Sequence, residues 1–128
     1  MAKANKTLRG TDSADRLTGT TGNDRIFGFA GDDLIASGVG RDKVKGGAGD
    51  DTFVTVNGGK GFVKVLDFEE GDVIEFCGCP ATRLEQRGRN VRVVKGDDVK
   101  AVLKGIDATE LDLDFKAGTI TLAVDPLV

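Results

Sequence analysis

The sequence contains no histidine, tryptophan or tyrosine, and only two cysteines, two prolines and one methionine among its 128 residues. Because histidine is the commonest general base and metal ligand, its absence argues against histidine-based zinc catalysis and against Ser/His or Cys/His nucleophile pairs. No apolar run approaches the roughly 20 residues that span a bilayer. We therefore expect neither a self-contained hydrolase nor a membrane span.

The charge pattern excludes further classes. The formal net charge is −3, and no basic run is interleaved with aromatic residues, so nucleic acid is not an expected partner. The first ten residues, MAKANKTLRG, are positively charged, but no apolar segment follows them as in a usual secretory signal peptide. The length fits one domain with a modest core.

Glycine, in contrast, is abundant at 19 residues, and much of it is periodic. From Gly10 to Val54 the chain reads in unbroken register as GTDSADRLT, GTTGNDRIF, GFAGDDLIA, SGVGRDKVK and GGAGDDTFV. Position six is always aspartate: Asp15, Asp24, Asp33, Asp42 and Asp51. Position eight is always apolar: Leu17, Ile26, Ile35, Val44 and Phe53.

Each unit of this array predicts a tight turn followed by a very short strand. Glycine recurs at positions one and four, which suits a turn of about six residues because glycine adopts positive φ without steric cost. The remaining three residues alternate as in a strand, with position eight pointing one way. Such strands are too short to bury an apolar side chain alone, so we expect them to stack and form one continuous apolar stripe.

The aspartates of stacked turns predict a bound cation. Stacked strands lie about 4.8 Å apart, and like charges at that distance repel by roughly 1 kcal/mol or more. Carboxylates and carbonyls without histidine or thiolate make a hard oxygen site, which favours calcium over magnesium. The alternative is a metal-free solenoid in which aspartate and glycine only form turns.

The five units resemble the RTX, or haemolysin-type, calcium-binding nonapeptide GGxGxDxUx. The resemblance implies an all-β fold, a parallel β-roll (a right-handed β-solenoid) in which two nonapeptides make one turn. The loops of units one, three and five then stack on one side, and those of units two and four on the other. Full calcium sites are expected between stacked loops.

In that family, a site takes the position-six carboxylates of two loops, carbonyls at positions two and four of the earlier loop, and carbonyls at positions one and three of the later loop. The implied site between units three and five is Phe29, Gly31, Asp33, Gly46, Ala48 and Asp51. The one between units two and four is Thr20, Gly22, Asp24, Ser37, Val39 and Asp42. The one between units one and three is Thr11, Ser13, Asp15, Gly28, Ala30 and Asp33. Because Ser13 and Ser37 replace glycine and Arg41 adds positive charge, the last two sites are expected to be weaker.

After Val54, the stretch FVKVLDFEEGDVIEF resembles the segment that closes the roll in serralysin-type secreted proteases. The resemblance implies a terminal calcium site made by Asp67 and Asp72 beside Gly47, Gly49 and Asp51. Val63 stands where an acidic residue is common in the family. The alternative is that both aspartates flank an ordinary hairpin turn.

The rest of the chain predicts an antiparallel, β-sandwich-like C-terminal cap. VRVVKGDDVKAVLKGI reads as two strands around a turn, residues 119–124 as another strand, and Leu111, Leu113 and Phe115 as packing residues. Such a cap would cover the exposed end of the roll. The expected division is an N-terminal capping strand (1–9), five repeats (10–54) and the cap (55–128).

The tail DPLV is similar to the ending of substrates of type I secretion, whose uncleaved signal is C-terminal. The resemblance implies a secreted, extracellular protein that stays loose at low cytosolic calcium and folds where calcium is millimolar. Cys77 and Cys79 depart from the family and leave a cytoplasmic location open. Their expected roles are apolar packing, an intermolecular disulfide or a soft-metal site.

The sequence thus predicts a non-catalytic calcium-binding β-roll, either free-standing or a module of a larger exported protein. One alternative is a carbohydrate-binding accessory module, as in bacterial alginate epimerases, which a basic stripe along one face would favour. An ice-binding solenoid is not expected, because it needs regular rows of threonine and the position-nine residues are Thr18, Phe27, Ala36, Lys45 and Val54.

Overall fold

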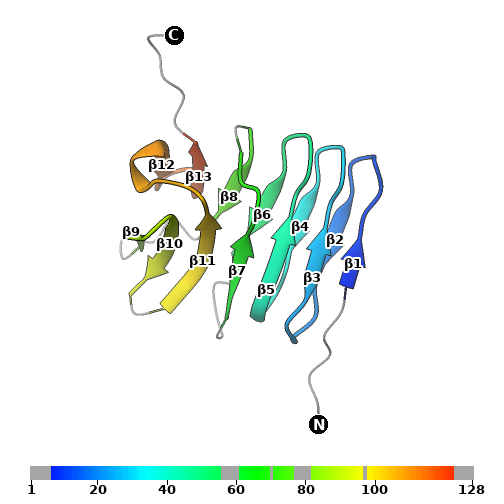
Figure 1. The fold of residues 1–128 in the computed structure, drawn as a ribbon, viewed down its shortest axis with the longest axis horizontal. Coiled ribbons are helices and arrows are strands. Elements are labelled where there is room, and N and C mark those ends of the chain that lie inside the picture. Colours follow the sequence, from blue (N-terminus) through cyan, green and yellow to red (C-terminus); the bar gives the residue numbers. More distant parts are fainter. Residues whose placement is uncertain (1–6, 56–60, 70, 77–81, 97, 123–128) are drawn as a thin grey trace.

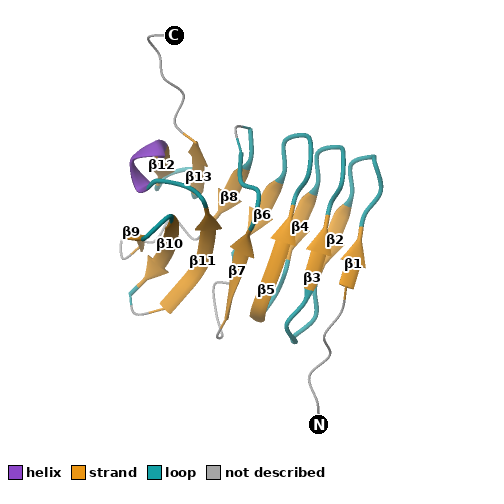
Figure 2. Cartoon of the chain, in the orientation of Figure 1, coloured by secondary structure: helices purple, strands orange, loops and turns teal. Residues whose placement is uncertain are grey.

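The computed structural model describes residues 7–55, 61–69, 71–76, 82–96 and 98–122, so Cys77, Cys79 and the DPLV tail lie outside the described residues. The described chain forms two β-sheets that lie one behind the other (Figures 1 and 2). The seven-stranded sheet has the order β1-β3-β5-β7-β11-β10-β9, and the six-stranded sheet β12-β13-β8-β6-β4-β2. No described helix is long and apolar enough to cross a membrane.

The strands alternate between the two sheets along the first half of the chain. The bounds are β1 Thr7–Arg9, β2 Arg16–Thr18, β3 Arg25–Phe27, β4 Leu34–Ala36, β5 Gly40–Lys45, β6 Thr52–Val54, β7 Gly61–Val65 and β8 Val73–Glu75. The second half contains β9 Thr82–Arg87, β10 Asn90–Lys95, β11 Asp98–Lys104, a short 3-10 helix η1 Ala108–Glu110, β12 Leu111–Asp114 and β13 Thr119–Leu122.

The nonapeptide units build a parallel β-roll, as the sequence predicts. Units one, three and five supply β2, β4 and β6, which pair in parallel with an offset of 18 residues. Units two and four supply β3 and β5, which pair in the same way on the other sheet. Two nonapeptides therefore make one turn.

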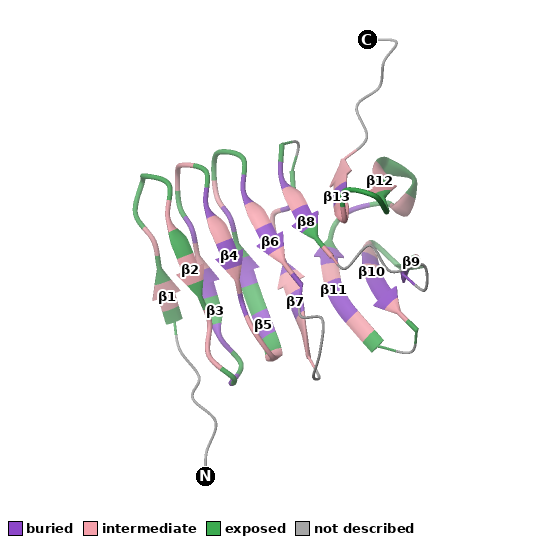
Figure 3. Ribbon diagram, turned by 180° about the vertical axis from the view of Figure 1, so that it is seen from behind, coloured by how far each residue is buried: buried purple, intermediate pink, exposed green. Residues whose placement is uncertain are grey.

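The position-eight side chains form the core between the sheets. Ile26, Ile35, Val44 and Phe53 are at most 1 % exposed, and neighbouring rungs place them in register. Figure 3 shows buried residues alternating with intermediate or exposed ones along these strands, as expected for strands with one face inward. Burial of this stripe is what holds such short strands together.

The roll continues beyond Val54 for another full turn. β7 pairs in parallel with β5 and β8 with β6, now with an offset of 21 residues, so that Val65 lies opposite Val44 and Ile74 opposite Phe53. The stretches GGKGFVKVL (58–66) and DFEEGDVIE (67–75) are thus a sixth and a seventh unit. Three extra residues before Gly58 shift the period, which is why counting in nines from Gly10 misses them.

The C-terminal half extends both sheets of the roll. β11 pairs in parallel with β7 and continues into the antiparallel strands β10 and β9, while β13 and β12 add antiparallel strands beside β8. This confirms the antiparallel sandwich-like cap. Leu111 and Leu113 pack against the core, but Phe115 is 45 % exposed and contacts only the edge of Phe76 in the described aromatic pairs. The domain boundaries stay a prediction.

Candidate metal centre

The turns of the repeats line two opposite edges of the roll. The loops of units one, three, five and seven follow β1, β3, β5 and β7 along the upper edge in Figure 1, and the loops of units two and four lie along the lower edge. Parallel stacking at a constant offset therefore brings equivalent loop residues beside one another. The position-six aspartates of each edge form a ladder.

From the second turn on, each aspartate of this ladder accepts a backbone hydrogen bond from the stacked loop that precedes it. The N–H of Asp15 donates to Oδ1 of Asp33 at 2.9 Å, that of Asp24 to Asp42 at 2.7 Å, and that of Asp33 to Asp51 at 2.9 Å. The same bond joins Asp51 N–H to Asp72 Oδ1 at 2.9 Å across the longer offset. The carboxylates of Asp33, Asp42, Asp51 and Asp72 thus each join two stacked loops with one oxygen.

The second carboxylate oxygen of three of these aspartates is buried without a hydrogen-bond partner among the described residues. Oδ2 of Asp33, Asp42 and Asp51 is buried and has no hydrogen-bond partner in the described structure, although these residues are at most 2 % exposed. A buried polar atom without a partner costs about 1 to 3 kcal/mol, and more for a charged group. Native structures keep few such atoms unless an ion or water satisfies them.

The pKa values of these three aspartates are raised, because burial disfavours their charged form. Burial raises the pKa of Asp42 to about 6 and of Asp51 to about 7, and it raises the pKa of Asp33 as well. Backbone hydrogen bonds oppose this shift, whereas neighbouring carboxylates of the ladder add to it. A divalent cation would relieve both the burial cost and the mutual repulsion.

Main-chain carbonyls line the space between the stacked loops. A Cβ placed on Gly28 would meet both Oδ2 of Asp33 and, at 2.7 Å, the carbonyl oxygen of Gly46. The carbonyl of Phe29 lies against Cα of Gly47, which has φ +83°, and that of Gly31 lies against Gly49. Only a residue without a side chain leaves this oxygen-lined space open.

The lower edge repeats the arrangement between units two and four. A Cβ on Gly38 would lie 2.9 Å from the carbonyl oxygen of Thr20, and the carbonyl of Gly22 approaches Gly40. Asp24 differs from Asp42, because Oδ2 of Asp24 accepts the Thr20 N–H at 2.7 Å and Oδ1 accepts its hydroxyl at 2.8 Å.

In the site between units one and three, the carboxylate of the first unit is also occupied by hydrogen bonds within its own loop. The carboxylate of Asp15 is only partly buried and accepts bonds from the backbone and hydroxyl of Thr11. The carbonyl of Ser13 lies near Gly31, and a Cβ on that glycine would approach its oxygen to 2.7 Å. The pair Asp33 and Asp51 thus offers more unbonded oxygen than the other two pairs.

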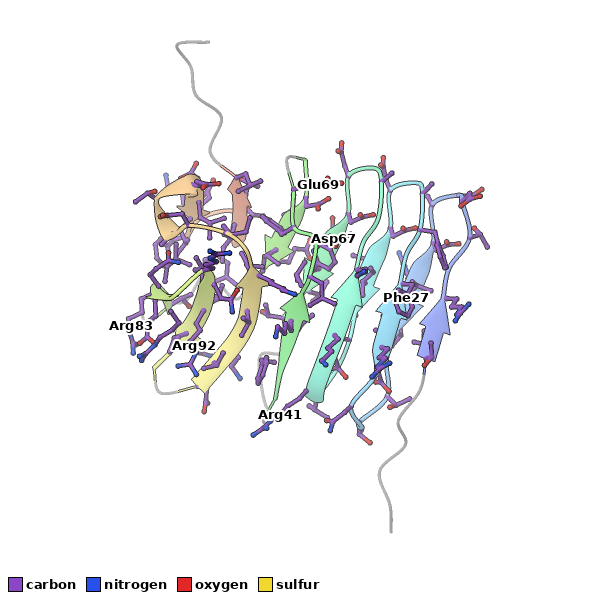
Figure 4. The ribbon with its side chains drawn as sticks, in the orientation of Figure 1. Phe27, Arg41, Asp67, Glu69, Arg83 and Arg92 are labelled. Carbon is purple, nitrogen blue, oxygen red and sulfur yellow. The ribbon has the colours of Figure 1, made fainter. Side chains whose placement is uncertain are left out.

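At the terminal site, the carboxylates bond the backbone instead. Asp67 accepts the N–H groups of Gly46 and Gly47, each at 2.9 Å, and Asp72 accepts those of Asp51 and Glu69 (Figure 4 labels Asp67 and Glu69). Burial raises the pKa of Asp72 to about 6. The carboxylates thus contact the loop that holds Gly47 and Asp51, but their oxygens are already hydrogen-bonded, and the terminal site stays a prediction.

A second ladder, at position five, was not predicted. Oδ1 of Asp32 accepts the N–H of Asp50 at 2.8 Å, and Oδ1 of Asn23 accepts that of Arg41 at 2.8 Å. The signal in the sequence was a side chain with an oxygen at position five in units two and three, Asn23 and Asp32. Each lies 18 residues before the residue whose N–H it accepts. These groups brace the loops from outside.

The donor set fits calcium. Among the described residues, no three acidic side chains converge closely enough to hold a metal on their own. Any cation between the loops must therefore take carbonyl oxygens together with one or two carboxylates, which are the hard ligands that calcium accepts in a flexible geometry. The individual ligand sets stay a prediction.

Together, the two-sheet roll and the aspartate ladders define a class of protein, a nonapeptide-repeat β-roll. A profile of the RTX calcium-binding nonapeptide repeat (4 copies) matches residues 9–44 and 35–62. Residues 9–62 therefore belong to the RTX calcium-binding repeat family.

A solved structure shares the fold. The AlgE6R3 subunit of the Azotobacter vinelandii mannuronan C5-epimerase is 26 % identical, with a TM-score of 0.58, over 79 % of this chain and 71 % of that chain. A comparison with curated protein sequences gave no match.

Proposed function

We propose that this chain is a non-catalytic module that binds calcium ions between its stacked loops and folds as it binds them. The single observation that carries the proposal is the set of three buried aspartate oxygens, on Asp33, Asp42 and Asp51, without partners among the described residues. Together with the family membership of the repeats, they support calcium as the missing partner. The residues named above would hold the ions, and a bound ion would neutralise the ladder.

Coupling to folding follows from where the ligands lie. Each pair of carboxylates comes from rungs 18 residues apart, so the site exists only when the rungs stack. Binding free energy is then folding free energy. Affinities of roughly 10⁻⁴ to 10⁻³ M, usual for extracellular calcium modules, would leave the sites empty in the cytosol and fill them outside the cell. We propose on this basis that the chain is exported and folds after export.

Calcium titration of the full chain tests the core of this proposal. We expect heat in calorimetry and a gain of β signal in circular dichroism on adding calcium, and little of either with magnesium. The double variant D33N/D51N should lose most of the response. The variant D112N, which alters an exposed aspartate of β12, is the matched control and should bind normally. A chain that gains neither heat nor β structure contradicts the proposal.

A second candidate function is that of a carbohydrate-binding accessory module. The observation that favours it is a basic stripe on the outer face of the seven-stranded sheet. Such a stripe is the feature expected, from the sequence, to distinguish this function from calcium binding alone. The similar AlgE6R3 subunit belongs to an epimerase of the polysaccharide mannuronan. Binding of glycans by the calcium-loaded chain is the test.

A further inference from the structure

The outer face of the seven-stranded sheet carries a concentration of positive charge. The side chains that alternate with the buried position-eight residues point outward, and on β1, β3, β5 and β7 most are cationic. We name as the cationic strip the residues Arg9, Arg25, Arg41, Lys43, Lys45, Lys64 and Arg92. Figure 4 labels Arg41 and Arg92 on this sheet.

Strand register arranges the strip in a row. Arg25 lies opposite Lys43, and Lys43 opposite Lys64, so three adjacent strands each contribute a cation at the same level. Beyond β7 the row passes Val102 and reaches Arg92 on β10. Adjacent strands are about 4.8 Å apart, so the row offers one positive charge about every 4.8 Å across β3, β5 and β7.

Most of these cations make no ion pair in the described part of the protein. The salt bridges among described residues all involve Glu85, which lies within 4 Å of Arg83, Arg87 and Arg92 at the far end of the row. The remaining six residues of the strip make no described ion pair. The chain as a whole carries a net charge of −3, so its acidic groups are concentrated elsewhere, chiefly in the loops at the two edges.

The surface along the strip is also hollowed. Besides a hollow of about 430 Å³ lined by Asn23, Asp24, Arg25, Arg41 and Lys43, there are two on the sheet face. One hollow, of about 450 Å³, is lined by Phe62, Lys64, Arg87, Asn90, Arg92 and Val102. The other, of about 200 Å³, is lined by Arg25, Ile26, Phe27, Lys43, Lys45 and Leu66. Each combines cations with an aromatic ring, and the first adds an amide for hydroxyl groups, a combination suited to sugar rings that bear carboxylates.

We propose that the cationic strip binds a single chain of a linear acidic polysaccharide, running across the strands with its carboxylates over Arg25, Lys43 and Lys64. This inference rests on the carbohydrate-binding function proposed above and specifies its ligand class and site. The evenly spaced row matches a polymer with one negative charge per sugar better than isolated anions. It also makes binding dependent on the folded roll, because the row is assembled from strands far apart in sequence.

The same surface fits a nucleic acid or a membrane less well. Single-stranded nucleic acids bind by stacking successive bases on aromatic rings. The two hollows offer one ring each, Phe62 and Phe27, and the Arg9 guanidinium lies 6.0 Å from the centre of the second. A duplex has about one charge per 1.7 Å and is wide enough to meet the acidic loops at the edges. The exposed apolar anchors that insert into lipid, Phe29 and Phe115, lie in turns off the strip.

The test uses the full calcium-loaded chain and polygalacturonate, a linear polymer with one carboxylate per sugar. We expect binding that weakens steeply with salt and is at least tenfold weaker in K43Q/K64Q. The matched control R16Q/K116Q removes the same charge from exposed cations off the strip and should change affinity less than twofold. Circular dichroism in calcium checks that each variant folds.

Three outcomes overturn the inference. If neutral dextran of matched length binds as well as polygalacturonate, carbohydrate binding stands but recognition of acidic sugars is wrong. If no glycan binds to the folded chain, both the inference and the carbohydrate-binding function fail, while the calcium function is untouched. Tighter binding of oligo-dT or of phosphatidylserine vesicles, lost in K43Q/K64Q, assigns the strip to that ligand instead.

Discussion

At the scale of single residues, the position-six aspartates do two jobs with two oxygens. Oδ1 accepts the N–H of the previous rung and is structural with or without metal. Oδ2 is left buried without a partner at Asp33, Asp42 and Asp51, and only a ligand satisfies it. Asp33 takes part in two stacked pairs, with Asp15 and with Asp51, and Asp51 likewise pairs with Asp33 and with Asp72, so these two should matter most.

Replacing Asp33 by asparagine tests this difference. The amide side chain of the D33N variant would retain an oxygen for the Asp15 N–H but lose the negative charge from two sites. We expect calcium affinity to fall at the sites of the upper edge by about tenfold or more, since calcium affinity scales with ligand charge. Calorimetry against D112N measures the change, and equal affinities in the two variants would contradict a ligand role.

The raised pKa values predict an unusual pH dependence without calcium. Burial raises the pKa of Asp42 and Asp72 to about 6 and of Asp51 to about 7, above the roughly 3.9 of an unfolded aspartate. The folded chain then binds more protons than the unfolded chain between these values, so stability falls as pH rises. The stabilisation is fully present below about pH 4 and is lost as the pH passes 6 to 7.

Thermal unfolding in EDTA should therefore give a higher Tm at pH 5 than at pH 8. In D51N the slope should be shallower, because that position no longer titrates. Calcium should restore the Tm at pH 8 by replacing the proton with a stronger positive charge. A Tm that rises between pH 5 and pH 8 in EDTA would show that these carboxyls do not govern stability.

At the scale of elements, the loops depend on glycine for two separable reasons. Gly47 has φ +83° and lies against the Phe29 carbonyl of the preceding rung, whereas Gly96 has φ +61° with nothing near it. G96A should cost about 1 to 2 kcal/mol in left-handed strain alone. G47A should cost about 1 to 3 kcal/mol more, because the added methyl overlaps the backbone. Denaturant unfolding in calcium measures both, and equal costs would mean that the loops stack less tightly than described.

The sixth unit offers a test in which the sign of the effect reverses. Val63 lies opposite Asp42, where a position-six aspartate would extend the lower ladder. V63D should destabilise the chain in EDTA, since it buries another charge. In calcium it should bind additional metal and recover stability. V63N is the uncharged control, and a V63D loss that is equal with and without calcium would contradict the proposed ligand geometry.

The sequence predicted some elements and not others for physical reasons. The first five units were predictable because one column of glycine, one of aspartate and one of apolar residues recur without interruption. Units six and seven were hidden by a three-residue insertion, by Val63 at the acidic column and by Asp67 at a glycine column. The bonds of Asp67 to two backbone N–H groups could not be read from spacing, because they depend on how that loop folds back.

At the scale of the whole molecule, the roll and its cap share two continuous sheets. β11 joins the cap to β7, and β13 joins it to β8, so neither sheet breaks where the repeats end. The cap contributes its own buried residues, including Val91, Leu103 and Ile120, which do not depend on the ladders. We expect calcium to control the repeats more strongly than the cap.

Hydrogen exchange measured with and without calcium tests this division. Residues 7–55 should exchange rapidly in EDTA and slowly in calcium, because their short strands rely on neutralised loops. The strands β10 and β11 should be protected longer in EDTA. Equal protection of the repeats in both conditions would show that the roll folds without metal.

The aspartate ladder also has a direction. Oδ1 of Asp33, Asp42, Asp51 and Asp72 receives its hydrogen bond from the aspartate N–H of the stacked loop on the N-terminal side, so a loop already in place presents an acceptor to the loop that precedes it. If the roll grows from its C-terminal end, the aspartate N–H of each added loop meets a position-six carboxylate that is already in place. If the roll grows from its N-terminal end, the aspartate N–H of each added loop has no acceptor until the next loop stacks on it. The position-six bonds thus favour growth of the roll from the cap toward its first residue, whereas the position-five bonds of Asn23 and Asp32 run in the opposite direction.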